Sequence, residues 1–184
     1  MYRALAWKGQ YEGLDLADES AMAALGERIT LDVSDGRVRV DGHDVAQAIR
    51  TPEMDQAAST VARQPRVRAA LIAQQRALGA QGGVVMEGRD IGTVVFPAAA
   101  VKIFLDASPE ERARRRAMDP AHASGKGASA IPEVAIALAE RDRVDSTRAA
   151  SPLTIADDAI VIDTTKLSIE EAVERVMDAI ARKE

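Results

Sequence analysis

A charged segment, Glu-Gly-Arg-Asp at residues 87–90, interrupts two apolar runs of the 184-residue chain. The preceding run, residues 84–86, is short and β-branched, which predicts a buried strand. Gly88 allows the backbone to turn sharply after it. The carboxyl ends of strands border the ligand crevice of an open α/β sheet, so we expect Arg89 and Asp90 to project there. Arginine can bind a phosphate, and aspartate can accept a hydrogen bond from a base or a sugar. The alternative is a surface turn whose charges only pair with one another.

Positive charge gathers in two further segments of the chain. These are Arg112, Arg114, Arg115 and Arg116, and then Arg141, Arg143 and Arg148. Because the formal net charge of the whole chain is −5, local arginines favour a small polyanionic ligand over a nucleic acid. Phosphoryl transfer requires such neutralisation of charge, and arginines on a movable segment can close over phosphates. A solvated helix face is the alternative interpretation.

Three residues of the second cluster have helical spacing. Arg141, Asp145 and Arg148 are separated by four and then three residues, so a helix places them on one face. This face could present donors and an acceptor to a ligand. It could equally be a ladder of ion pairs within the helix.

Composition limits the class of protein. A chain of 184 residues with 47% hydrophobic and 29% charged residues suits one globular domain. The absence of cysteine excludes disulfides and thiolate metal sites, and His43 and His122 lie too far apart in sequence to suggest a histidine metal site. No apolar run reaches membrane-spanning length and the amino terminus lacks a signal-peptide pattern, so we expect a cytoplasmic protein without membrane or nucleic-acid partners.

The second half of the chain has the pattern of an α/β fold. Strands are predicted at residues 84–86, 101–105 and 159–162, and helices are predicted from capping patterns at Ser108 and Ser168 and from Pro132. Strands separated by helices predict a parallel sheet covered on both faces. Residues 123–130 are small and polar, which predicts a mobile loop.

The first half resembles a small inserted lobe. Helices are predicted from Tyr2 to a stop at Gly9, and from Asp18 to a stop at Gly26. Hairpin turns are predicted at Asp35-Gly36 and Asp41-Gly42, between short strands at 29–33, 37–40 and beyond. Two more helices are predicted to begin at Pro52 and Pro65, the second ending at Gly79.

Several motifs occur together in one order along the chain. They are residues 87–97 and 101–108, Tyr2-Arg3 at the start, residues 57–59, 65–68 and 141–148, and Pro152-Leu153. In this order and spacing they resemble the bacterial cytidylate kinases, which are P-loop nucleoside monophosphate kinases. The resemblance implies one kinase domain over 1–184, with a three-layer α/β fold and a parallel sheet. It also implies an inserted β-containing nucleoside monophosphate lobe at 10–80, and an arginine-rich lid with its return helix at 112–148. The implied reaction is transfer of phosphate from ATP to CMP or dCMP with Mg²⁺, and no protein partner is evident.

The same resemblance implies roles for individual residues. Ser59, Arg68 and Asp90 would lie near the cytosine. The CMP phosphate would be bound by Arg89 and Arg148, with Arg3 as a helper, and Tyr2 would line the monophosphate pocket. The sugar would face Arg141 and Asp145, and the ATP phosphates would be reached by the lid residues Arg112, Arg115 and Arg116. Of these, Arg89, Arg115, Arg141 and Arg148 are the expected catalytic residues, and no residue is expected to hold a metal. Glu87 departs from the family, which usually has aspartate there.

One family feature is missing from the printed sequence. The family opens with a strand and a G-x-x-x-x-G-K-[ST] loop that holds the ATP phosphates and magnesium. The Gly125-Lys126 pair fails this pattern, because Pro120 and Gly127 stand where glycine and Ser/Thr are required. We therefore expect an amino-terminally shortened form that lacks the first strands of the fold and is inactive as printed. The alternative is a non-catalytic CMP-binding or structural remnant.

Overall fold

The computed structural model describes residues 1–33, 37–80, 82–119 and 127–183. The predicted turn at Asp35-Gly36, His122 and the Gly125-Lys126 pair lie outside the described residues. The chain forms two compact units. The first contains Met1–Val84, and the second contains Val85–Met118 and the residues from Gly127 onward.

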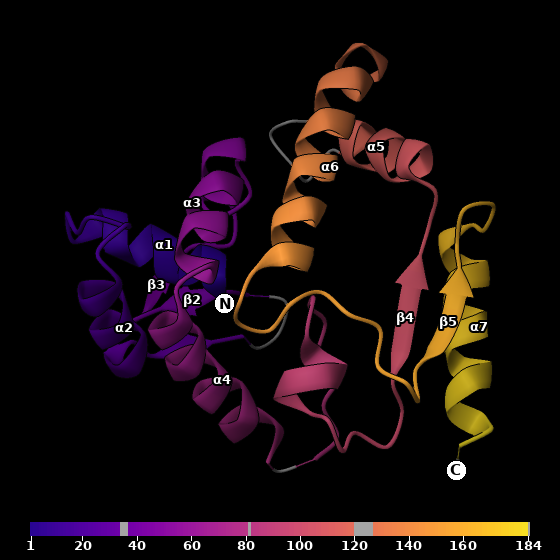
Figure 1. Cartoon of the computed structure of the whole chain (residues 1–184), viewed down its shortest axis with the longest axis horizontal. Coiled ribbons are helices and arrows are strands. Elements are labelled where there is room, and N and C mark those ends of the chain that lie inside the picture. The colour runs from indigo at the N-terminus through magenta and orange to yellow at the C-terminus, as the bar shows by residue number, and fades with distance from the viewer. Residues whose placement is uncertain (34–36, 81, 120–126, 184) are drawn as a thin grey trace. The chain divides into compact units, whose positions relative to one another are not determined.

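The first unit consists of helices and a small antiparallel sheet (Figure 1). Its elements are α1 (Tyr2–Tyr11), α2 (Glu19–Arg28), β1 (Leu31–Asp32), β2 (Arg39–Val40), β3 (His43–Asp44), α3 (Pro52–Ala62) and α4 (Pro65–Gly79). The strands pair in the order β1-β2-β3. Helix α1 packs against α3, and α2 packs against α4.

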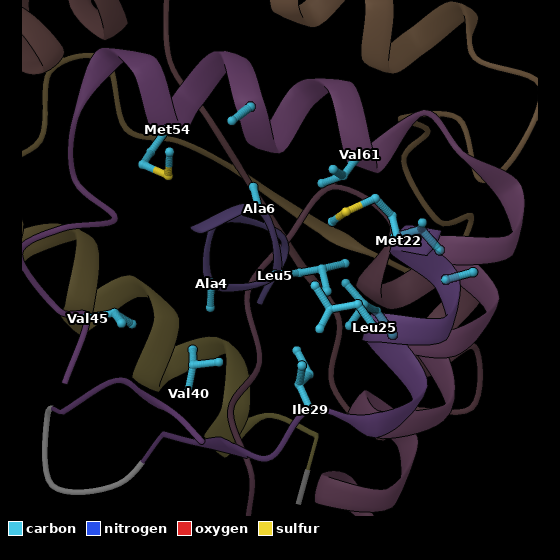
Figure 2. Close-up of a cluster of buried hydrophobic side chains, with 14 residues drawn as sticks. Ala4, Leu5, Ala6, Met22, Leu25, Ile29, Val40, Val45, Met54 and Val61 are labelled. Carbon is cyan, nitrogen blue, oxygen red and sulfur yellow. The ribbon is translucent and has the colours of Figure 1, made fainter. Parts of the chain in front are cut away.

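A contiguous apolar core holds the first unit together. Leu5 of α1 and Leu25 of α2 are fully buried and face each other (Figure 2), and Val61 of α3 and Leu71 of α4 complete the contact between helices. Each such side chain contributes about 1.5–3 kcal/mol when it leaves water. The core therefore depends on residues contributed by all four helices.

The predicted caps and turns of this unit are confirmed where they can be seen. Asp18 accepts hydrogen bonds from the amides of Ser20 and Ala21 at the start of α2. Helix α3 begins at Pro52 as predicted, and the structure adds Thr51 as its cap, which accepts from the amide of Met54. At the β2–β3 turn, Asp41 and Gly42 both have positive φ, 48° and 82°. This is the conformation that favours Asp-Gly in a two-residue hairpin.

Two predicted helix stops are wrong. Helix α1 continues beyond Gly9 to Tyr11, and α2 continues beyond Gly26 to Arg28. Both glycines are buried within their helices. A Cβ atom at Gly9 would lie 2.9 Å from side-chain atoms of Leu16 and Met22. Close packing, rather than helix termination, therefore explains the glycine at this position.

The second unit contains the parallel strands. Its elements are the π-helix η1 (Ile91–Val95), β4 (Ile103–Asp106), α5 (Pro109–Met118), the 3₁₀ turn η2 (Ala128–Ala130), α6 (Ile131–Thr147), β5 (Ile160–Asp163) and α7 (Ile169–Ala181). Strands β4 and β5 pair in parallel, from Ile103 opposite Ile160 to Asp106 opposite Asp163. Helix α7 packs against β5 and α5 against α6 (Figure 1). The predicted parallel pairing and the predicted start of α6 at Pro132 are confirmed.

The predicted strand at residues 84–86 is wrong. These residues form no strand, and Val85 is 97% exposed. A strand requires a neighbour to pair with, and within the described residues β4 pairs with β5 alone.

The predicted covering of both sheet faces is also incomplete. Leu105 and Val161 lie at adjacent register positions of the pair, on opposite faces, and both are more than half exposed. Ile169, Val173 and Met177 of α7, spaced four residues apart, are likewise exposed. The predicted mobile loop at 123–130 is described only from Gly127 onward, where η2 forms. No helix in the described part of the chain is long and apolar enough to cross a membrane.

A buried ammonium group joins distant segments of the first unit. Lys8 on α1 lies 2.9 Å from Asp41 Oδ2 and 3.3 Å from Glu12 Oε1. Asp41 Oδ1 accepts a hydrogen bond of 2.8 Å from the amide of Thr30. The hydrogen bond to Asp41 raises the pKa of Lys8, whereas the Thr30 amide and then Lys8 lower the pKa of Asp41. This carboxylate therefore links α1 to both ends of the β1–β2 hairpin.

We expect Asp41→Asn to destabilise the first unit. Asparagine keeps the turn conformation and an acceptor for the Thr30 amide, but it removes the negative charge beside a buried ammonium group. The urea unfolding midpoint should fall. Asp44→Asn is the matched control, because the exposed carboxylate of Asp44 accepts a hydrogen bond from the nearby amide of Ala46. Equal midpoints for the two variants would contradict the role assigned to Asp41.

Candidate functional site

The second unit contains a connected set of charged side chains that we call the arginine–aspartate network. Its members are Arg89, Asp90, Arg112, Arg141, Asp142, Asp145 and Arg148. Helix α5 supplies Arg112, helix α6 supplies Arg141, Asp142 and Asp145, and the others precede η1 or follow α6 directly. Four guanidinium groups and three carboxylates leave an excess of one positive charge. An anion is therefore the ligand that this network favours.

Asp145 lies at the centre of the network. Its carboxylate is 3.1 Å from Arg148 Nη1, 3.2 Å from Arg89 Nε and 3.8 Å from Arg141 Nε, and its side chain is only 10% exposed. A buried carboxylate requires such partners because its desolvation is costly. Asp145 thereby fixes the directions in which three arginines point.

Arg148 connects this centre to the segment before η1. Its side chain is 7% exposed, its Nε donates a 2.6 Å hydrogen bond to the carbonyl of Ser151, and its Nη2 lies 3.9 Å from Asp90 Oδ1. Asp90 is equally buried. The two are thus held against each other with little access to solvent.

The two simpler interpretations of the sequence do not describe this arrangement. Arg89 pairs with Asp142 and Asp145 of α6, and Asp90 is buried, so residues 87–90 are not a surface turn whose charges pair internally. The ion pairs among Arg141, Asp145 and Arg148 do exist. They are not merely an intrahelical ladder, because Arg89 joins them from a distant segment.

The arginines of α5 fall into separate groups. Arg112 donates to Asp142 and so belongs to the network. Arg115 instead donates to the hydroxyl and carbonyl oxygens of Thr164, after β5, and pairs with Glu111. Arg114 also pairs with Glu111, and Arg116 is half-buried. The predicted contacts of Arg112, Arg115 and Arg116 with ATP stay predictions.

Four of the predicted binding residues lie in the first unit. The guanidinium of Arg68 is buried and lies 5.3 Å from the centroid of the Tyr2 ring, a cation–π contact. Arg3 pairs with Asp55 at 2.5 Å and donates to the carbonyl of Ile49. Ser59 is half-buried on α3. The structure thus brings Tyr2 and Arg68 together, and it adds Asp55 as a partner of Arg3.

Magnesium does not fit the described residues. They contain no group of three or more His, Cys, Asp or Glu side chains that could hold a metal ion. The carboxylates of the arginine–aspartate network already face guanidinium groups, which would repel a cation.

Comparison with known proteins decides the family. The family model described as cytidylate kinase matches residues 1–182. The chain belongs to the cytidylate kinase family. The resemblance predicted from the motifs is confirmed, and the names of relatives support the predicted function of a CMP kinase, a phosphotransferase.

Three relatives illustrate the match. The chain is 44% identical over 180 residues to the cytidylate kinase of Solibacter usitatus, covering 98% of this chain and 78% of that protein. It is 46% identical over 186 residues to the cytidylate kinase of Pelotomaculum thermopropionicum, and the match covers 98% of this chain and 81% of that protein. It is 48% identical over 183 residues to the bifunctional pantoate ligase/cytidylate kinase of Synechococcus sp. strain WH7803. The chain spans 37% of the length of that protein.

The sequence patterns did not identify Asp142 of the second unit or Asp55 of the first unit as carboxylate partners of the predicted binding residues. Asp142 bridges Arg89 and Arg112, and Asp55 holds Arg3. The sequence feature that could have indicated Asp142 is its position between Arg141 and Arg143 in a predicted helix. Glu87, the residue that departs from the family pattern, is exposed.

The pairing of Glu111 predicts a pH dependence of stability for the second unit. Hydrogen bonds from Arg114 and then Arg115 lower the pKa of Glu111 from 4.5 to about 2. Because the folded-state pKa is depressed, the stabilisation is complete above pH 4.5 and is lost as the pH falls toward 2. We expect Glu111→Gln to be less stable than the parent at pH 6 and to lose less stability on acidification.

Urea unfolding at several pH values between 6 and 3 measures this difference. Glu140→Gln is a control, because Glu140 forms an exposed pair with Arg143 on α6. Parallel curves for Glu111→Gln and the parent would show that the pairing of Glu111 contributes nothing.

Proposed function

We propose that this chain binds CMP and dCMP and takes part in their ATP-dependent phosphorylation to CDP and dCDP. The observation that carries the proposal is the buried contact of Asp145 with Arg89 and Arg148, in a network with excess positive charge. Such a network neutralises phosphate oxygens, and phosphoryl transfer depends chiefly on positioning and charge neutralisation. The names of the relatives agree with this chemistry.

The geometry of Arg89 supports its role as a phosphate ligand. Its Nη2 donates to Asp142 at 2.8 Å, and its Nε lies 3.2 Å from Asp145. Within the described residues, Nη1 has no hydrogen-bond partner. Two carboxylates therefore fix the plane of the guanidinium while one nitrogen is left to bind a phosphate oxygen.

Recognition of cytosine is assigned to acceptor groups. Asp90 is buried beside Arg148, and the oxygens of its carboxylate can accept hydrogen bonds. It can accept from the exocyclic amine of cytosine. Uracil presents a carbonyl in place of that amine. The contacts of Ser59, Arg68, Tyr2 and Arg3 with CMP remain part of this proposal.

A second function is a CMP-binding chain without catalysis. It applies to the 184 residues taken by themselves, in which no G-x-x-x-x-G-K-[ST] loop occurs. That loop supplies the lysine and the amides that neutralise ATP, and Mg²⁺ is held there in P-loop kinases. The two functions share the CMP site and differ in turnover.

Replacing Arg89 tests the shared site. We expect Arg89→Ala to weaken CMP binding by at least tenfold, about 1.4 kcal/mol, because a charge-assisted contact to phosphate is lost. Isothermal titration calorimetry on the 184-residue chain measures the affinity after a thermal melt has established that each variant is folded. Arg143→Ala is the matched control, since Arg143 forms an exposed ion pair with Glu140. An unchanged affinity in Arg89→Ala would remove this residue from the site.

Turnover distinguishes the two functions. We expect the 184-residue chain alone to form CDP from CMP and ATP at a negligible rate, because the printed sequence offers no evident substitute for the phosphate loop. A version extended by a strand and phosphate loop of a cytidylate kinase relative serves as the comparison in a coupled assay of CDP formation. Comparable rates for the two proteins would contradict the expectation and require a different ATP site.

A further inference from the structure

One carboxylate bridges two arginines to which different ligands have been assigned. Asp142 Oδ1 accepts a 2.8 Å hydrogen bond from Arg89 Nη2, and Asp142 Oδ2 accepts a 2.5 Å hydrogen bond from Arg112 Nη1. Each oxygen therefore serves one arginine. We propose that Asp142 is a positioning residue that holds Arg89 and Arg112 together as one anion-binding pair, an inference that rests on the proposed function.

The electrostatics of the pair require such a bridge. Two guanidinium groups that reach the same carboxylate are close enough to repel each other, and the carboxylate between them offsets this repulsion. Asp142 is 21% exposed, and Arg89 and Arg112 are about one third exposed. Partial burial reduces screening by water and salt, so the bridge has more influence than a fully exposed ion pair.

Asp142 and Asp145 act on Arg89 from two sides. Asp145 contacts Nε and Asp142 contacts Nη2, so rotation of the guanidinium is opposed at both positions. Among the described residues, Arg112 has one such contact, through Nη1, and its buried Nε has no hydrogen-bond partner there. Arg112 therefore depends more strongly on Asp142 than Arg89 does.

The bridge also connects two elements of the second unit. Arg89 precedes η1, whereas Arg112 lies on α5, which corresponds to the start of the predicted lid. Asp142 joins the arginine assigned to the CMP phosphate to an arginine assigned to the ATP phosphates. Loss of its charge would separate the two groups that must converge on the transferred phosphate.

Asp142→Asn is the variant that tests positioning. Asparagine keeps the size and one acceptor oxygen but presents donors to the second arginine. We expect the order parameters of the Nε–Hε groups of Arg89 and Arg112, measured by ¹⁵N NMR on the 184-residue chain, to fall in Asp142→Asn, with the larger fall at Arg112. Glu140→Gln, two residues away on the same helix, should leave them unchanged. Unchanged order parameters in Asp142→Asn overturn the proposal without any ligand being present.

CMP binding provides the second readout. We expect Asp142→Asn to weaken CMP binding about tenfold, the scale of a charge-assisted contact. It should have no further effect in the Arg89→Ala background, because Asp142 acts through Arg89. Additive losses in the double variant would indicate a general structural role and overturn the proposal.

The two readouts separate this inference from the proposed function. If the parent chain is folded but binds no CMP, the proposed function fails, and the NMR result alone decides whether Asp142 positions the arginines. If the parent binds CMP and Asp142→Asn binds it equally well, the positioning role fails while the proposed function stands.

Discussion

The second unit depends on a nearly buried carboxylate surrounded by guanidinium groups. Asp145 contacts Arg89 from the segment before η1, Arg141 on its own helix and Arg148 just beyond that helix. Removing one partner from a buried ion pair typically costs about 3–5 kcal/mol, because the remaining charge is left without compensation. The segments on either side of the site are therefore constrained to meet α6, and the arginines can face a ligand only in the orientations that Asp145 allows.

The first unit uses the same physical device for a different purpose. Lys8 is buried against Asp41 and Glu12, and this contact joins α1 to the hairpin turn. The apolar core is formed by the helices, so the short strands contribute few large side chains to it. A buried charge with a specific partner gives the hairpin a defined position that apolar packing alone would not specify.

Local features of the fold could be predicted from sequence because their causes are local. The capping groups of Asp18 and Ser168, the helix start at Pro52 and the turn at Asp41-Gly42 depend on residues a few positions apart. Residues 84–86 have strand-forming side chains, but a strand also requires a partner, which no local pattern supplies. The glycines at positions 9 and 26 could not be distinguished from helix stops without knowing which helices pack against them.

In the candidate site, too, contacts within one helix could be predicted from sequence, whereas contacts between distant segments could not. The spacing of Arg141, Asp145 and Arg148 predicted their contact correctly, since the helix itself determines it. The bridge through Asp142 brings together residues 53 positions apart and 30 positions apart. These contacts depend on how α5 and the segment before η1 pack against α6. Helix α6 contains several acidic residues, so charge alone does not identify Asp142 as the one that contacts both arginines.

The unpaired edge of β4 has a consequence for the behaviour of concentrated solutions. Within the described residues β4 pairs only with β5, and Leu105, Val161 and the exposed face of α7 place apolar side chains nearby. Free backbone groups at a sheet edge are a template for strands of other molecules, and exposed apolar side chains strengthen such association. Purified chain should therefore self-associate as its concentration rises, and a peptide that caps this edge should act as a solubilising agent.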